Sequence, residues 1–189
     1  MSEKNNSKDV LIETASRLFR LRGYYGVGLK DILADSGIPK GSLYHYFPEG
    51  KEQLAIAAIE HIKEIVINEI QELFDEIEDP IIAFQLHLDY LSEIIVNGKN
   101  IGFPIGTIAG ETHSTSEPIR IACQLAFTEW QAIYEKKLLL SGYDKVQATD
   151  LGITVNLMIE GAILLSLTSK SNRPLEVAKK HITILLSKD

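Results

Sequence analysis

The chain has 189 residues, of which 45% are hydrophobic and 24% are charged, with a formal net charge of −7. These values are typical of a globular protein with one or two small domains. The first residues are polar and predict no secretory leader, so we expect a cytoplasmic protein. Cys123 is the only cysteine, which excludes an intrachain disulfide and a metal cage built from cysteines.

The negative charge is unevenly distributed along the sequence. Residues 1–54 contain 8 Lys or Arg and 7 Asp or Glu, a net of +1, whereas residues 55–189 contain 11 and 19, a net of −8. The acidity therefore belongs to the larger C-terminal part. A large positive field for nucleic acid is excluded, and any such binding must depend on a few well-placed contacts.

Glycine and proline residues divide the sequence into segments with helical periodicity, and no segment shows the alternation of a strand. The pattern predicts an all-α protein of about nine helices, with no internal repeats. The helices are expected over residues 8–22, 29–36, 40–47, 50–78, 80–96, a short stretch from 104, 116–140, 144–168 and 175–186.

The segment 40–47 predicts a helix whose outer face is built for contact. At about 100° per residue, Leu43 and Phe47 share one face, while Gly41 and His45 point the opposite way. The preceding segment, 29–36, has the spacing of a short helix and is followed by a glycine that suits a sharp turn. Together the two segments predict a helix-turn-helix. The alternative is a small amphipathic helix whose tyrosines and histidine only cover the core.

Residues 10–54 resemble the N-terminal domain of TetR-type transcriptional repressors. One departure is that Gly28 and Leu29 stand where the family often has a Ser or Thr cap, which predicts a weaker start of the second helix. The resemblance is carried by residues 15–19, 22–24, 31–32, 36–38, 40–44, 47 and 51–52.

Two further features are similar to the LmrA/YxaF-like branch of this family, which includes lincomycin-resistance and flavonoid-responsive regulators. The turn Pro48–Glu49–Gly50 is one residue longer than is common in the family. The later run 102–106 contains two glycines and a proline among apolar residues. The resemblance implies an N-terminal DNA-binding domain, residues 1–50, and a helical ligand-binding and dimerisation domain, residues 51–189.

The side chains expected to contact DNA are those exposed around the second helix of the helix-turn-helix. Lysines are expected to attract phosphates, hydroxyls to hydrogen-bond phosphate oxygens, and His45 to reach a base edge. Pro39 also suits an apolar contact with a thymine methyl group. Lys51, at the start of the following helix, lies where free backbone N–H groups attract phosphate. The predicted DNA contacts are Lys30, Pro39, Lys40, Gly41, Ser42, Tyr44, His45, Tyr46 and Lys51.

The central part of the chain is the expected sensor of a small hydrophobic or aromatic effector. The segment 103–111 is apolar but broken by glycine and proline, which makes it a poor core filler and a good cavity lining. The alternative is that each of these apolar residues belongs to an ordinary core. The predicted ligand contacts are Phe84, Leu88, Leu91, Phe103, Ile105, Ile108, Phe127, Trp130, Tyr134 and Met158.

Residues 151–168 are apolar over nearly the length of a membrane span but contain Glu160, which is costly at the centre of a bilayer. We interpret this segment as a helix buried on most sides. Gly161 and Ala162 permit close approach of a neighbouring helix. We therefore expect this helix and the last one to form a four-helix bundle with a second copy, without membrane insertion.

No catalytic or metal-binding pattern stands out. The five histidines are scattered, and none lies three or four residues from another histidine or from the cysteine. We therefore predict no enzyme activity and no cofactor. The sequence favours a ligand-responsive repressor that binds a palindromic operator as a dimer. The alternatives are a TetR-like regulator that is constitutive or controlled by a protein partner, and a helical carrier of small molecules.

Overall fold

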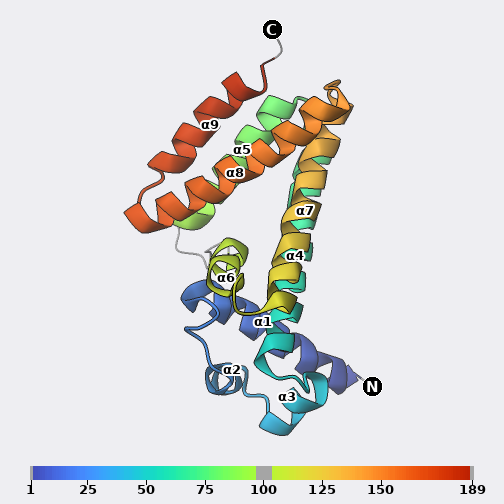
Figure 1. Ribbon diagram of the computed structural model, residues 1–189, viewed down its shortest axis with the longest axis vertical. Coiled ribbons are helices and arrows are strands. Elements are labelled where there is room, and N and C mark those ends of the chain that lie inside the picture. Colours follow the sequence, from blue (N-terminus) through green and yellow to red (C-terminus); the bar gives the residue numbers. More distant parts are fainter. Residues whose placement is uncertain (1, 97–103, 188–189) are drawn as a thin grey trace. The chain divides into compact units, whose positions relative to one another are not determined.

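The computed structural model describes residues 2–96 and 104–187, and within them all regular structure is helical (Figure 1). The prediction of an all-α protein of about nine helices is confirmed. The helices are α1 (Ser2–Arg22), α2 (Leu29–Ser36), α3 (Lys40–Tyr46), α4 (Lys51–Glu76), α5 (Pro80–Val96), α6 (Pro104–Thr112), α7 (Glu117–Leu140), α8 (Lys145–Ser169) and α9 (Arg173–Leu185).

The chain forms two compact units. Unit 1 contains residues 1–64 and 103–126, and unit 2 contains residues 65–102 and 127–189. Unit 1 therefore includes α6 and the first part of α7 in addition to the helix-turn-helix. The division into a DNA-binding domain, residues 1–50, and a ligand-binding and dimerisation domain, residues 51–189, concerns function and stays a prediction.

The core of unit 1 forms where α1 packs on α2 and α3. The inner face of α1 presents Leu11, Ala15, Leu18 and Phe19, all of which are buried. This is the apolar stripe expected from its helical spacing, and burying it stabilises α2 and α3, which have 8 and 7 residues and are too short to be stable alone.

The turns of the helix-turn-helix depend on two glycines with positive φ. Gly37, at φ 68°, ends α2 and donates its N–H to the carbonyl oxygen of Leu33. Gly50, at φ 73°, closes the turn before α4. Residues with a Cβ rarely adopt this left-handed conformation, so these two positions favour glycine. The start of α2 lacks a side-chain cap at Gly28, but the carboxylate of Asp31 accepts the Gly28 N–H at 2.7 Å.

In unit 2, α9 packs against both α5 and α8 (Figure 1). Its buried residues Leu175, Ala178 and Ile182 follow the predicted stripe. The ammonium of Lys179 pairs with the carboxylate of Asp89 at 2.6 Å and ties α9 to α5 at the edge of this packing.

A buried lysine closes the end of α4 within unit 2. The ammonium of Lys137 donates hydrogen bonds to the carbonyl oxygens of Phe74, at 2.7 Å, and Ile77. The last carbonyl oxygens of a helix have no partners inside the helix and carry the negative end of its dipole. Lys137 therefore both satisfies these oxygens and neutralises their charge.

Among the described helices, α8 alone is long and apolar enough to cross a bilayer by length and composition. The sequence predicts that this helix is buried on most sides. Within a single chain, only one of its faces is buried. Its outer face leaves Leu157 and Leu164 exposed at 67% and 62%. Its inner residues are Ala148, Gly152, Val155, Asn156, Ile159, Ala162, Ile163 and Ser166.

Candidate nucleic-acid interface and effector site

Helix α3 is held in unit 1 by two apolar side chains. Leu43 is fully buried and Phe47, which follows the helix, is 2% exposed. Pro39 precedes the first turn with an extended backbone, and its carbonyl oxygen accepts the N–H of Leu43 at 3.2 Å. A helix this short has one buried face, so its other side chains face solvent.

The outer face of α3 is open. Gly41 is exposed, and a Cβ added there would have no heavy atom within 4 Å. Tyr44 is 43% exposed, and the ammonium of Lys40 lies 5.7 Å from the centroid of its ring. His45 is exposed and makes an edge contact with the ring of Tyr46 at 5.0 Å between centroids. The hypothesis that α3 is only a covered core helix is not supported by these exposures.

The remaining predicted DNA contacts are also accessible. Lys30, Pro39 and Lys40 are exposed, while Ser42, Tyr46 and Lys51 are half-buried. All nine predicted residues belong to unit 1: Lys30 on α2, Pro39 just before α3, six residues on α3, and Lys51 in the first turn of α4. Their roles in binding stay predictions.

Lys51 lies against two aromatic rings. Its ammonium is 4.0 Å from the centroid of Tyr24 and 5.9 Å from that of Tyr25. Burial lowers the pKa of Lys51, while the nearby carboxylates of Glu111 and Asp31 oppose this change. A cation over an aromatic face is attracted to the negative ring surface, which fixes where the charge lies.

A group of contacts that the sequence did not indicate joins the end of α6 to these tyrosines. The carboxylate oxygen Oε2 of Glu111 accepts the backbone N–H groups of Tyr24, at 2.6 Å, and Tyr25, at 3.1 Å. Thr115 hydrogen-bonds to the Tyr25 hydroxyl at 2.6 Å. The partners in these contacts are separated by 86 to 90 positions in the sequence, and no short-range pattern predicts such pairs.

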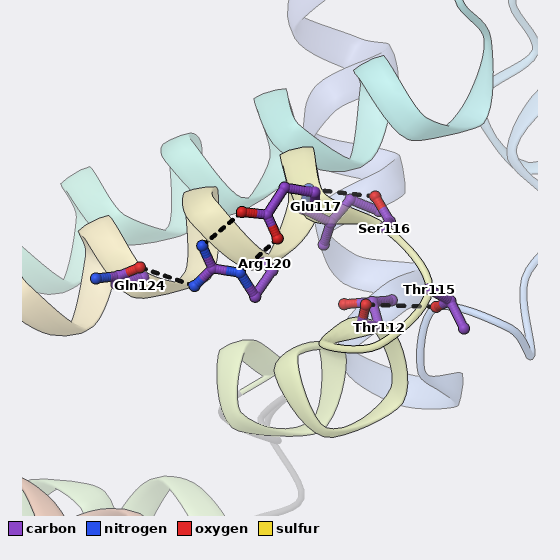
Figure 2. A network of polar contacts seen from close by, with 7 residues as sticks. Thr112, Thr115, Ser116, Glu117, Arg120 and Gln124 are labelled. Carbon is purple, nitrogen blue, oxygen red and sulfur yellow. Dashed lines mark hydrogen bonds and ion pairs between the residues drawn. The ribbon is translucent and has the colours of Figure 1, made fainter.

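The start of α7 is also fixed to this part of unit 1. The hydroxyl of Ser116 donates to the carboxylate of Glu52 at 2.7 Å and accepts the N–H of Ile119 at 3.3 Å. Figure 2 shows Ser116 beside an exposed pair in which Arg120 binds Glu117 with two hydrogen bonds of 2.7 Å. The segment between α6 and α7 is thus a short polar connection rather than a free loop.

Most of the predicted effector residues lie in unit 2, where several form an aromatic cluster. The rings of Phe84 and Tyr134 are 5.4 Å apart, and Phe74, which the sequence did not single out, contacts both. The Tyr134 hydroxyl lies 3.4 Å from Nε2 of the buried His87. Burial lowers the pKa of His87 to about 4, so this ring is neutral at pH 7.

Glu160 on α8 adds an acidic group near Tyr134. Burial raises the pKa of the Glu160 carboxyl to about 7. The pKa of the Tyr134 hydroxyl is also raised, mainly by burial and to a smaller extent by the nearby charge of Glu160. The interior of unit 2 therefore combines aromatic side chains with a few polar groups. Such a combination is typical of sites for small organic ligands.

The other predicted effector residues are distributed over the two units. Leu88 and Leu91 are buried in unit 2, where Phe127 and Trp130 form an edge contact at 5.7 Å. Met158 lies half-buried on α8 in the same unit. Of the remaining members, Ile105 and Ile108 are buried in unit 1, and Phe103 lies outside the described residues.

A shallow apolar groove runs along α8 and α9 in unit 2. It has a volume of about 550 Å³. Ile184, further along α9, is 66% exposed. The groove is lined by Leu157, Met158, Gly161, Ala162, Leu165, Arg173, Pro174, Val177, Ala178 and His181.

Within the described ranges, no group of three His, Cys, Asp or Glu side chains is arranged to hold a metal ion. Cys123 is a buried free thiol, and burial raises its pKa to about 11. A thiol with so high a pKa is protonated at neutral pH and is a poor nucleophile.

Two family models cover most of the chain. Residues 11–58 match the model of bacterial regulatory proteins of the tetR family. Residues 80–181, more than half of the chain, match the C-terminal domain of LmrA/YxaF-like transcriptional regulators. The chain belongs to the TetR family of bacterial transcriptional regulators. Within this family its C-terminal region is that of the LmrA/YxaF-like branch, as the sequence suggested.

Curated relatives and solved structures agree with this assignment. The chain is 43% identical to the regulator YxaF of Bacillus subtilis, covering 100% of this chain and 99% of that protein. It is 45% identical to the regulator LmrA of the same species, covering 90% and 91%. The crystal structure of reduced NemR from Escherichia coli has a TM-score of 0.88 at 22% identity, covering 97% and 98%, which shows a common fold.

These relatives are transcriptional regulators and not enzymes. Regulators of this family bind DNA and dimerise. The hypothesis of a helical carrier is therefore set aside in favour of a regulator.

Proposed function

We propose that this regulator is a repressor that binds a palindromic operator as a homodimer and releases it when a small hydrophobic or aromatic effector binds. The observation that supports DNA binding by α3 is its open outer face above a buried anchor. Gly41 has no neighbour within 4 Å of its Cβ position, while Leu43 is fully buried on the opposite side. A face of this kind suits close approach to the floor of a major groove.

The proposed contacts divide by chemistry. Lys30, Lys40 and Lys51 bind phosphates, and the hydroxyls of Ser42 and Tyr44 donate to phosphate oxygens. His45 reaches a base edge, next to Tyr46, and Pro39 and Gly41 allow close apolar contact. Because the first 54 residues carry a net charge of only +1, these few contacts must supply most of the affinity.

The proposed dimer joins α8 and α9 of one subunit to the same helices of a second copy. The exposed leucines of α8 and the exposed Ile184 of α9 supply the apolar area that such a four-helix bundle buries. Both α3 helices then enter successive major grooves, whose centres are about 34–36 Å apart.

The proposed effector site lies in the aromatic interior of unit 2. Phe84 and Tyr134 offer stacking surfaces, while His87 and Glu160 offer hydrogen-bonding groups for a polar substituent. The effector acts by favouring a spacing of the two α3 helices that does not fit the operator. A coupling free energy of about 1–3 kcal/mol per site weakens operator binding several-fold to a hundredfold.

DNA fragments captured from genomic DNA by the purified protein identify the operator for the first test. We expect Tyr44→Ala to weaken binding to all sequences, because it removes a phosphate contact. We expect His45→Ala to change the preference between matched and mismatched operators. Gel shifts in which neither variant differs from the parent protein contradict the placement of α3 in the groove.

The effector is tested separately by thermal denaturation with hydrophobic and phenolic compounds. A compound that binds the native protein raises its melting temperature, and an effector also lowers operator affinity. A regulator that responds to none of them supports the second hypothesis, that of a constitutive or protein-controlled TetR regulator.

A further inference from the structure

The carboxylate of Glu111 lies on the turn that follows α1. Its Oε2 atom accepts two successive backbone N–H groups, those of Tyr24 and Tyr25, at 2.6 and 3.1 Å. Hydrogen bonds to a charged acceptor are roughly twice as strong as neutral ones. Gly23 has a φ of 71°, which favours glycine, and a Cβ there would overlap the other carboxylate oxygen unless the Glu111 side chain shifted. Glu111 thus fixes the backbone of this turn.

The tyrosine rings of this turn lie next to the side chain of Lys51. The Tyr24 ring lies 4.0 Å from the Lys51 ammonium, and the Tyr25 ring lies at 5.9 Å. Lys51 is the first residue of α4, where the N–H groups of the first turn have no partners within the helix. These N–H groups and the ammonium together form a suitable place for a phosphate.

Two further contacts hold the same region from the α6–α7 segment. Thr115 hydrogen-bonds to the Tyr25 hydroxyl at 2.6 Å, and Ser116 donates to Glu52, the neighbour of Lys51, at 2.7 Å (Figure 2 shows both α6–α7 residues). Three side chains within six residues therefore contact Tyr24, Tyr25 or Glu52, which are neighbours of Lys51 in space or in sequence. Glu111 is the only one of the three that binds backbone groups of the turn.

We propose that Glu111 is a positioning residue for operator binding, which fixes the Tyr24–Tyr25 turn so that Tyr24 holds the Lys51 ammonium at the start of α4 for a DNA phosphate. This inference rests on the proposed role of Lys51 in DNA binding. Glu111 itself touches no DNA, because its carboxylate would repel a phosphate. In this proposal its effect on operator binding passes through the position of Lys51.

A double-mutant cycle with Lys51→Ala and Glu111→Ala tests this dependence. Operator affinity is measured by fluorescence anisotropy on a captured operator fragment, over a range of salt concentrations. We expect Lys51→Ala to lower affinity about tenfold and to reduce the salt slope by about 0.9 for each of the two phosphates that the dimer contacts. We expect Glu111→Ala to reproduce both changes, and the double variant to bind no more weakly than Lys51→Ala alone.

Two variants serve as controls. Glu111→Gln keeps an oxygen that accepts N–H groups and should restore most of the affinity and the salt slope. Glu117→Gln makes the same change six residues later, where the carboxylate pairs only with exposed Arg120 among the contacts described, and should bind like the parent. Melting temperatures establish that every variant is folded.

The outcomes separate the inference from the function on which it rests. If Lys51→Ala leaves both affinity and salt slope unchanged, the phosphate contact of Lys51 is wrong and the inference falls with it. If Lys51→Ala behaves as expected but Glu111→Ala leaves the salt slope unchanged and the two losses multiply, Glu111 has only a structural role. That result overturns the inference and leaves the proposed operator contact intact.

Discussion

The substitution Gly41→Ala separates the stability of α3 from its function. A Cβ at position 41 meets no heavy atom within 4 Å, so the added methyl group causes no clash in the folded protein. Alanine also restricts the unfolded chain and favours the helix, which contributes about 0.4–1 kcal/mol to stability. For a chain of this length we expect the melting temperature to rise by about 1–4 °C.

Operator binding should change in the opposite direction. If the Gly41 face lies on the floor of the groove, the methyl group forces the helix away from the bases. By analogy with overpacking in protein cores, this costs about 1–3 kcal/mol per half-site. The dimer carries two such sites, so the loss is at least about 2 kcal/mol, or roughly thirtyfold in affinity.

Both quantities are measured on the same preparation, by thermal denaturation and by fluorescence anisotropy with the captured operator. Gly110→Ala is the matched control, because Gly110 is also an exposed helical glycine with no heavy atom within 4 Å of its Cβ position. It should gain stability and keep its affinity. A Gly41→Ala protein that binds within twofold of the parent would show that this face does not meet DNA.

Three further predictions concern unit 2. Burial raises the pKa of Glu160 from 4.5 to about 7, so the native state keeps a proton that the unfolded chain loses, and stability falls as pH rises through this window. One pKa unit corresponds to about 1.4 kcal/mol, so Glu160→Gln should stabilise the protein by about 3 kcal/mol at pH 8 and have little effect at pH 4.5. Urea titrations at the two pH values measure this difference, and equal effects at both contradict the raised pKa. Lys137→Met removes two hydrogen bonds to the end of α4 and should lower the free energy of unfolding by about 3 kcal/mol at pH 7; a loss below about 0.5 kcal/mol in urea titrations would show that the bonds are unimportant. Leu164→Glu, on the exposed face of α8, should yield monomers in sedimentation experiments, while Leu140→Glu, at the even more exposed end of α7, should not. An unchanged dimer for Leu164→Glu refutes the proposed interface.

Several helix boundaries could be predicted because local chemistry decides them, whereas α1 begins at Ser2 and not near residue 8 as expected. Pro80 and Pro104 begin helices, and Gly37 ends one in the left-handed conformation that glycine favours. The inner face of α9 could be predicted equally well, because its apolar residues recur at helical spacing. Such signals act over a few residues and need no knowledge of the tertiary structure.

The outer and inner faces of α8 could not be separated in this way. Apolar residues occupy all sides of this helix, so its sequence contains no stripe that identifies the packed face. Gly152 reveals that face only in three dimensions: a Cβ there would lie 3.2 Å from the carbonyl oxygen of Gln131 and 3.3 Å from the N atom of Glu135. The packing of α8 on α7 therefore depends on a close backbone approach.

The candidate DNA-binding residues could be predicted from the sequence, whereas the residues that support them could not. Tyr44 and His45 stand in a motif with family spacing, and the structure leaves both exposed as expected. Glu111 binds backbone N–H groups, which every residue except proline possesses, so its partners have no side-chain signature. The same applies to Lys137, whose partners are carbonyl oxygens some 60 residues earlier in the chain.

The missing side chain at Gly23 couples two positions that are distant in the sequence. The carboxylate of Glu111 occupies the volume that a methyl group at position 23 would need, and the φ of 71° already disfavours other residues. An alanine at position 23 would therefore require the Glu111 carboxylate to move or a shorter side chain at position 111. Covariation of these two columns among related regulators would be the evolutionary record of that shared space.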